Sequence, residues 1–153
     1  MKKDVVVIGL GNPLMTDEGI GVRLIDCLAE LGGEAVGIDF IDAGTGGFSV
    51  IHQIEGRRKA VFIDCAYMGA EPGSIKRFSP EDVKSEKVLA HQSLHEADLL
   101  KILDMAKELG QSPDEIVIFG IEPAAVKPGF DLSEKLESRL DDYVSVICAE
   151  LGL

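Results

Sequence analysis

The sequence predicts an α/β fold: a three-layer α/β/α sandwich with a twisted, mainly parallel central sheet of about five strands. Short runs of β-branched residues alternate along the chain with longer segments of helical apolar spacing, a pattern typical of parallel strands covered by helices. Glycines cluster directly after the first two runs, where a strand turns toward the next element. With 153 residues, 46% of them hydrophobic, we expect a single domain over residues 1–153.

The expected strands follow in order along the chain. Residues 5–10 read VVVIGL, a continuous apolar run typical of a strand buried on both faces. The same reasoning predicts strands over residues 35–41, 60–65 and 115–121. A shorter strand is expected over residues 74–78, at an edge of the sheet.

The expected helices lie between these strands. Apolar residues at helical spacing predict helices over residues 19–31 and 94–109. Residues 48–54 fit a short helix, and residues 79–82 a capped turn with serine at the cap and proline at the first helical position. The closing helix is expected over residues 132–151. Its apolar face contains Leu136, Leu140, Tyr143, Ile147 and Leu151.

Charge and cysteine content narrow the classes of partner. The formal net charge is -12, whereas nucleic acids are bound through Lys and Arg, so we expect no nucleic-acid partner and no anionic membrane surface. No apolar stretch approaches the roughly 20 residues that span a bilayer, and the first residues carry no signal-peptide pattern. Cys27, Cys65 and Cys148 are few and widely spaced. We expect them in the core, and the protein in the reducing cytoplasm.

The loop after the first strand, GLGNPLMTDEGIG, has the outline of a phosphate-binding loop. A dinucleotide fingerprint needs a third glycine where this chain has Leu14, and the P-loop lysine is absent. GLGNP also begins peptidyl-tRNA hydrolases, but a charge of -12 fits a tRNA substrate poorly. Asp17 and Glu18 stand near a helix N-terminus, which favours acids. We expect Asp17 to support the helix and Glu18 to face the crevice.

Acidic groups recur where the expected strands end. In open α/β sheets the ligand crevice lies at the carboxyl ends of the strands. Glu18 follows the first strand, Asp42 follows the second, and Asp64 ends the third. Asp64 alone would more simply be a turn residue, but its position beside the other two acids favours a site.

A histidine near the start of the 94–109 helix can complete this set. His95 falls in the first helical turn, where the dipole disfavours imidazolium, and metals bind neutral imidazole. His95 can equally be an exposed residue without a role, and His91 in the preceding loop is the alternative ligand. Two carboxylates and one imidazole, with positions left open, suit divalent ions such as Ni, Zn or Fe.

Five short motifs in order resemble those of the nickel–iron hydrogenase maturation endopeptidases. In chain order they are GLGN followed by DEGIG, DAGTG, VFID, SLHE and GIEP. Together they span nearly the whole chain. The resemblance implies the twisted-sheet α/β/α fold and one domain of this family over residues 1–153.

The resemblance also implies an activity. It is that of an aspartic-type endopeptidase that removes the C-terminal extension of a nickel–iron hydrogenase large-subunit precursor after nickel insertion. Glu18, Asp64 and His95 match the family's metal ligands, with nickel carried by the substrate and zinc as another ion that they can bind in vitro. Asp42 matches the aspartate expected to recognise substrate or shape the crevice, and Asp64 or Glu18 would activate water. The alternative is a metal-binding accessory protein of hydrogenase assembly without peptidase activity.

Overall fold

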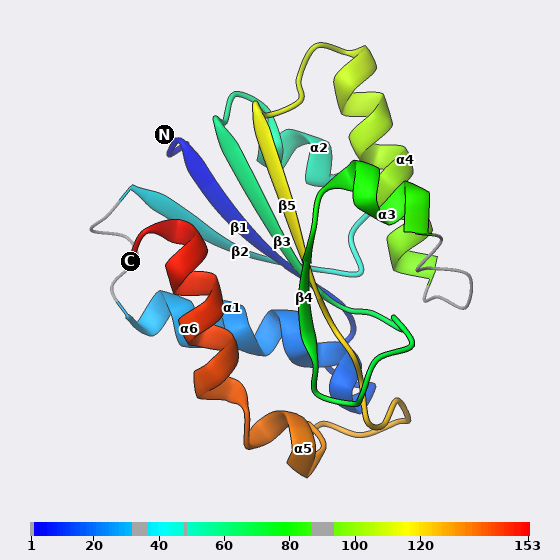
Figure 1. Cartoon of the computed structure of the whole chain (residues 1–153). Helices are drawn as coiled ribbons and strands as arrows, with labels where there is room; N and C mark the ends of the chain where they lie inside the picture. The colour runs from blue at the N-terminus through cyan, green and yellow to red at the C-terminus, as the bar shows by residue number, and fades with distance from the viewer. Residues whose placement is uncertain (1, 32–36, 48, 87–93) are drawn as a thin grey trace.

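A five-stranded sheet forms the centre of the molecule (Figure 1). The computed structural model describes residues 2–31, 37–47, 49–86 and 94–153, without the side chains of residues 84–98. The strand order is β2-β1-β3-β5-β4, and every pair is parallel except β4 with β5. The strands are β1 (Val5–Leu10), β2 (Ile38–Gly44), β3 (Lys59–Cys65), β4 (Ile75–Phe78) and β5 (Glu115–Ile121).

Helices cover both faces of this sheet (Figure 1). They are α1 (Ile20–Glu30), α2 (Ser49–Ile54), α3 (Pro80–Glu86), α4 (Leu94–Glu108), α5 (Glu134–Glu137) and α6 (Leu140–Leu151), with a 3-10 turn, η1 (Thr16–Gly19), before α1. The buried apolar residues form two clusters, one between the sheet and α1 with α6, the other between the sheet and α2, α3 and α4. The predicted three-layer fold is confirmed. In the described part of the chain, no helix is long and apolar enough to cross a membrane.

The order of the strands creates a switch point beside β1. From β1 the chain passes over α1 to β2 on one side, and from β2 over α2 to β3 on the other side of β1. The two connections leave the sheet on opposite faces, which opens a crevice at the carboxyl ends of the strands. Figure 1 shows α4 running opposite to β5, so the first turn of α4 lies toward this same end.

Two glycines let α1 pack closely on the sheet. A Cβ atom at Gly21 would overlap the carbonyl oxygen of Ile63 and lie 2.5 Å from that of Leu10. A Cβ atom at Gly9 would overlap the carbonyl oxygen of Gly21. These are backbone atoms, so no side-chain rotation relieves the overlap. Gly21 therefore has the packing role of the third fingerprint glycine, but further along the chain, and the residues before it form the acidic loop.

The expected closing helix over residues 132–151 is wrong in one respect, because it is broken into α5 and α6. The chain leaves helical geometry at Arg139, which has φ -110° and ψ 8°. The Ser138 hydroxyl donates to the carbonyl of Lys135 at 3.0 Å, a local bond of the kind that competes with helix continuation. The apolar face is nevertheless buried through Leu136, Tyr143 and Ile147.

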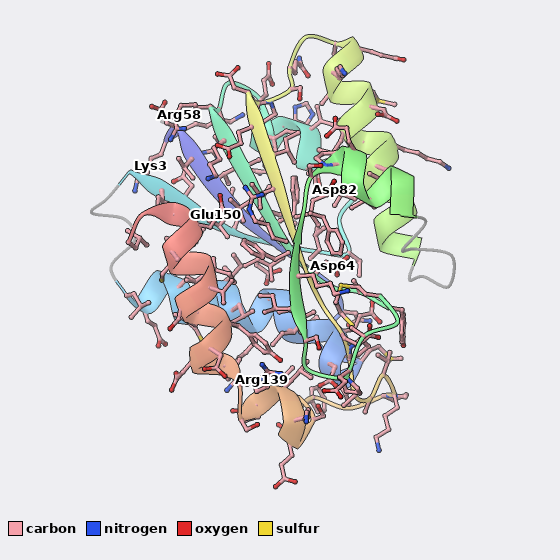
Figure 2. The ribbon with its side chains drawn as sticks, in the orientation of Figure 1. Lys3, Arg58, Asp64, Asp82, Arg139 and Glu150 are labelled. Atoms are coloured by element: carbon pink, nitrogen blue, oxygen red, sulfur yellow. The ribbon has the colours of Figure 1, made fainter. Side chains whose placement is uncertain are left out.

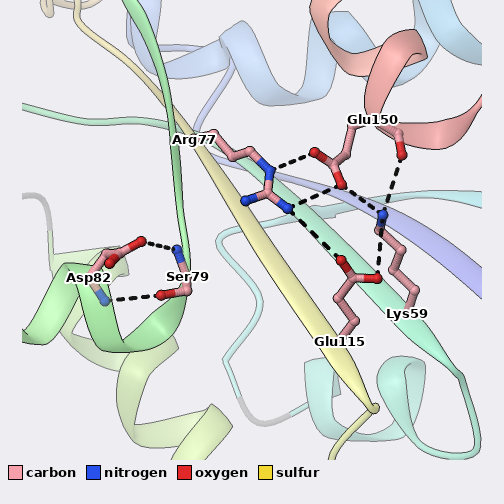
Figure 3. Close-up of polar contacts among 6 residues, drawn as sticks. All are labelled: Lys59, Arg77, Ser79, Asp82, Glu115 and Glu150. Carbon is pink, nitrogen blue, oxygen red and sulfur yellow. Dashed lines mark hydrogen bonds and ion pairs between the residues drawn. The ribbon is translucent and has the colours of Figure 1, made fainter.

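The remaining boundaries differ little from expectation. The strand expected at 35–41 is observed from Ile38 onward, and the short helix begins at Ser49; residues 35–36 and 48 lie outside the described residues. The short strand at 74–78 is confirmed as an antiparallel edge strand. The capped turn is confirmed too. The Asp82 amide donates to Ser79 Oγ at 3.1 Å, and the Ser79 amide donates to Asp82 Oδ2 at 3.0 Å (Figure 3).

An ion-pair network fastens α6 to the sheet (Figure 3). Glu150 accepts hydrogen bonds from Lys59 Nζ at 2.7 Å and from Arg77 Nε at 2.5 Å. Glu115 lies 3.6 Å from Lys59 Nζ and 3.9 Å from Arg77 Nη2. The hydrogen bond from Arg77, followed by the bond and charge of Lys59, lowers the pKa of Glu150 to about 2. The ionised Glu150 therefore holds the last helix against β3 and β4.

Candidate active site

Asp64 is a buried carboxylate to which the described residues supply no hydrogen bond. It lies near the carboxyl end of β3 (Figure 2). Ala60 and Phe62 belong to the core cluster under α2 and α4, so strand alternation directs Asp64 to the same face. Asp64 is 2% exposed, and neither carboxylate oxygen has a hydrogen-bond partner among the described residues.

Burial dominates the electrostatics of this carboxylate. It raises the pKa of Asp64 to about 8; the neighbouring Cys65 amide offsets part of the rise, and the charge of Glu18 adds to it. Buried polar groups almost always have partners, because leaving them without any costs folding free energy. Exceptions with strongly shifted pKa values concentrate at functional sites. Asp64 is therefore the strongest functional candidate in the described part of the chain.

Glu18 lies beside Asp64 because the chain turns at Gly11. This glycine has φ +122°, a conformation that residues with a Cβ rarely adopt. A Cβ atom there would overlap the carbonyl oxygen of Glu18 and would lie 3.8 Å from Asp64 Oδ1. The effect of Glu18 on the pKa of Asp64 agrees with this closeness. The structure thus brings together two of the predicted site residues, whose roles remain predictions.

Asp17, next to Glu18, has a role that differs from the expected one. Its carboxylate is fully buried. Oδ2 accepts hydrogen bonds from the amides of Ala124 at 2.8 Å and Ala125 at 2.9 Å, and Oδ1 accepts one from the amide of Ser133 at 2.7 Å. Asp17 therefore anchors the loop between β5 and α5, rather than supporting the start of α1.

Thr16 reinforces this anchor. Its hydroxyl donates to the carbonyl of Ala125 at 2.7 Å and accepts from the amide of Lys127 at 3.1 Å. Its own amide donates to the carbonyl of Gly129 at 3.0 Å. Thr16 has φ 48°, which is strained for a β-branched residue and persists only where the surroundings hold it. The acidic loop and the β5–α5 loop therefore form one fixed unit.

Glu122, the glutamate of the GIEP motif, organises another loop at this end. Its side chain is buried, and Oε1 accepts from the amides of Met68 at 2.7 Å and Ala70 at 3.1 Å. Tyr67 lies in this β3–β4 loop. Burial raises the pKa of Tyr67, and Cys65 and the charges of Glu18 and Glu122 raise it further, which favours the neutral phenol.

Asp42 reaches the same end of the sheet from β2. It pairs in register with Gly9 of β1. The side chain is exposed, and its Oδ1 accepts from the amide of Gly44 at 2.9 Å. The carbonyl of Gly44 in turn accepts from the amide of Gly11 at 2.8 Å. Asp42 therefore shapes the turn beside the acidic loop, with β1 between it and Asp64.

The predicted histidine can be placed only by its backbone. Helix α4 begins at Leu94, so His95 lies in its first turn, as predicted. The His95 side chain and all of His91 lie outside the described residues. Among the side chains that are described, no group of three His, Cys, Asp or Glu is arranged to hold a metal ion. The buried Asp64 carboxylate beside a second acid, Glu18, is nevertheless the donor chemistry that a divalent cation requires.

The cysteines do not contribute to the site as nucleophiles. Cys65 is buried in the core under α1 and α6, on the face opposite Asp64, as predicted. Cys148 is half-buried against the same core. Cys27 is half-buried and belongs to neither described core cluster, so its expected core position is wrong. Burial raises the pKa of both Cys27 and Cys148, which favours the unreactive thiol.

Comparison with known proteins places this chain in a family. A family model described as hydrogenase maturation protease matches residues 22–150. The hydrogenase expression/formation protein HoxM of Cupriavidus necator is 30% identical over 141 residues, which cover 92% of this chain and 70% of that protein. The hydrogenase 2 maturation protease of Escherichia coli is 26% identical over 151 residues, covering 96% of this chain and 90% of that protein.

A solved structure agrees with the sequence comparisons. The hydrogenase maturating endopeptidase HybD from Escherichia coli superimposes with a TM-score of 0.82 at 25% identity, covering 99% of this chain and 92% of the other. The similarity therefore extends over the sheet, both helical layers and the segments that carry Glu18 and Asp64. The chain belongs to the hydrogenase maturation protease family.

Proposed function

We propose that this protease removes the C-terminal extension of a nickel–iron hydrogenase large-subunit precursor after nickel insertion, and that it recognises the nickel through Glu18, Asp64 and His95. Membership of the family makes the chain a peptide hydrolase that processes hydrogenase precursors. The observation that carries the finer proposal is the buried Asp64 carboxylate, without a hydrogen-bond partner in the described chain and next to Glu18.

In this proposal the nickel is part of the substrate. A carboxylate buried without partners is destabilising, and an approaching cation supplies the favourable interaction that it lacks. Glu18 lies close enough to share the ion, and His95 comes from the start of α4. A divalent ion held at this place polarises a carbonyl oxygen and lowers the pKa of bound water. Asp64 or Glu18 would then accept the proton of the attacking water.

The remaining assignments follow the same logic. Asp42 is exposed on the turn beside the acidic loop, which suits substrate recognition better than bond cleavage. Zinc is a second ion that the same donors would bind in vitro. A cytoplasmic location stays a prediction from the cysteine content, and the precursor is the only partner that the proposal requires.

The test is a cleavage assay with a nickel-loaded large-subunit precursor. We expect wild-type protein to release the C-terminal extension, and Glu18→Gln, Asp64→Asn and His95→Ala to leave it in place. His52→Ala is the matched histidine control, because His52 is exposed on α2, and it should cleave like wild type. His91→Ala separates the two candidate ligands: it should retain activity if His95 is the ligand.

Several results would decide against parts of the proposal. The peptidase assignment is wrong if the extension survives wild-type protein. If wild type cleaves and Glu18→Gln and His95→Ala cleave equally fast, the assigned site residues are wrong. Binding of nickel and precursor without cleavage would favour the accessory-protein alternative. Equal cleavage of nickel-free and nickel-loaded precursor would refute recognition of nickel while leaving the peptidase activity intact.

A further inference from the structure

Large apolar side chains are exposed on the loops around Glu18 and Asp64. Phe130 is 83% exposed, Leu14 is 55% exposed and Tyr67 is 40% exposed. They come from three different connections: the acidic loop after β1, the β3–β4 loop and the β5–α5 loop. In Figure 1 these connections lie together at the end of the sheet to which the strands' carboxyl ends point. Exposed apolar groups gathered beside a site mark a surface for binding another molecule.

Leu14 and Phe130 are held as neighbours by backbone hydrogen bonds. The carbonyl of Leu14 accepts from the amide of Gly129 at 2.9 Å, and Met15 and Gly129 form a β-bridge. Asp17 fixes the same two loops from the buried side. These apolar side chains therefore project from backbone that is already ordered, which reduces the entropy lost on binding.

The segments around Leu14 and Phe130 contain fewer acidic residues than the rest of the chain. The sequence contains 27 Asp and Glu residues, yet residues 13–15 and 127–130 contain none and include one lysine, Lys127. Pro13 and Pro128 are exposed beside Leu14 and Phe130. An apolar surface flanked by Lys127 and Asp131 fits an apolar stretch of polypeptide, with a charged rim beyond it.

We propose that Pro13, Leu14, Pro128 and Phe130, together the Leu14–Phe130 surface, bind an apolar segment of the hydrogenase precursor next to the bond that is cleaved. This inference rests on the proposed function, because that function makes a polypeptide the molecule that reaches Glu18. Continuity with the site favours the precursor over other occupants: Leu14 and Glu18 lie in one fixed loop. Phe130 is the anchor, as a rigid aromatic side chain with its ring in solvent before binding.

The test measures precursor binding and cleavage separately. The double variant Leu14→Ala/Phe130→Ala should raise the Kd and the KM for the precursor about tenfold or more, with kcat at saturation and urea stability unchanged. Phe130→Leu, which keeps an apolar side chain, should recover much of the affinity. Leu109→Ala is the matched control, because Leu109 is 59% exposed and directly follows the last residue of α4, and it should bind and cleave like wild type.

Three outcomes would overturn the docking surface alone. Unchanged Kd and KM in the double variant would do so, as would a fall in kcat with KM unchanged. A wild-type dimer in sedimentation that the double variant dissociates, with precursor binding unaltered, would assign the surface to a second copy of the chain. If wild type binds the precursor but does not cleave it, the proposed function fails. The docking surface is then still tested by comparing the Kd of wild type for the precursor with that of the double variant. If wild type does not bind, both fail.

Discussion

Replacing Asp64 by asparagine should stabilise the metal-free protein while abolishing its activity. The substitution keeps the shape of the side chain and removes its ability to ionise. Asp64 is buried and has no hydrogen-bond partner among the described residues. The substitution by asparagine therefore removes no hydrogen bond with a described residue. The expected gain comes from the cost of keeping an acid in this position.

The magnitude follows from the pKa of Asp64, which burial raises from 3.8 to about 8. Between these values the folded state retains a proton that the unfolded state has released. The free energy of unfolding therefore falls as pH rises through this interval, by about 1.4 kcal/mol per pH unit. At pH 7 the loss reaches about 4 kcal/mol, an upper value because protein interiors screen charge better than a dry medium. We expect Asp64→Asn to gain about 2–4 kcal/mol at pH 7 and almost nothing at pH 4.

Urea unfolding followed by circular dichroism at several values between pH 4 and pH 8, with a chelator present, measures this difference. Asp42→Asn is the matched control: Asp42 is exposed, and the asparagine oxygen can still accept from the Gly44 amide. The control should change stability by less than about 0.5 kcal/mol. Added nickel or zinc should stabilise wild type and not Asp64→Asn.

Two results would refute this reasoning. One is an Asp64→Asn protein that is no more stable than wild type at pH 7. The other is a gain that does not grow between pH 4 and pH 8. Either would mean that the buried carboxylate is satisfied by a group outside the described side chains, and the main argument for a cation site at Asp64 would disappear.

Three further predictions concern the frame around the site. Asp17→Asn should lose about 2–4 kcal/mol, because its three amide donors lose a charged acceptor; urea unfolding measures this. Glu150→Gln should lose about 1–2 kcal/mol at pH 7. Since the pKa of Glu150 is lowered from 4.5 to about 2, its ion pairs stabilise above pH 4.5 and are lost as pH falls to 2, so acid unfolding of wild type and variant should converge. Gly21→Ala should cost about 3 kcal/mol or more by overlap with backbone. Gly47→Ala should be nearly neutral in thermal unfolding, because no described atom other than those of its chain neighbours lies within 4 Å of the added Cβ.

Elements with strong local signals could be predicted with their bounds. β1 and β5 are continuous apolar runs because parallel strands are covered on both faces, and their observed limits match those expected. The break between α5 and α6 could not be predicted. A local bond from the Ser138 hydroxyl to the Lys135 carbonyl accompanies it, while the apolar spacing continues through the break.

The positions of the site residues were predictable only where the order of the strands determines them. Parallel strands bring their carboxyl ends to one edge, so Asp64 and Glu18 could be expected there from sequence. The anchoring role of Asp17 could not, because its partners lie more than 100 residues away along the chain. The absence of partners around Asp64 in the described chain is likewise a property of the packed structure, and no local pattern encodes it.

Asp17 and Asp64 are both buried acids at one end of the sheet, yet the fold treats them in opposite ways. Asp17 receives three backbone hydrogen bonds and fixes the loops that carry Glu18. Asp64 receives none from the described residues, and burial raises its pKa to about 8. The same end of the sheet thus provides backbone donors for Asp17 and none, among the described residues, for Asp64. This difference favours a ligand as the partner of the Asp64 carboxylate. The two asparagine variants separate these roles: Asp17→Asn should lower stability and activity together, while Asp64→Asn should lower activity as stability rises.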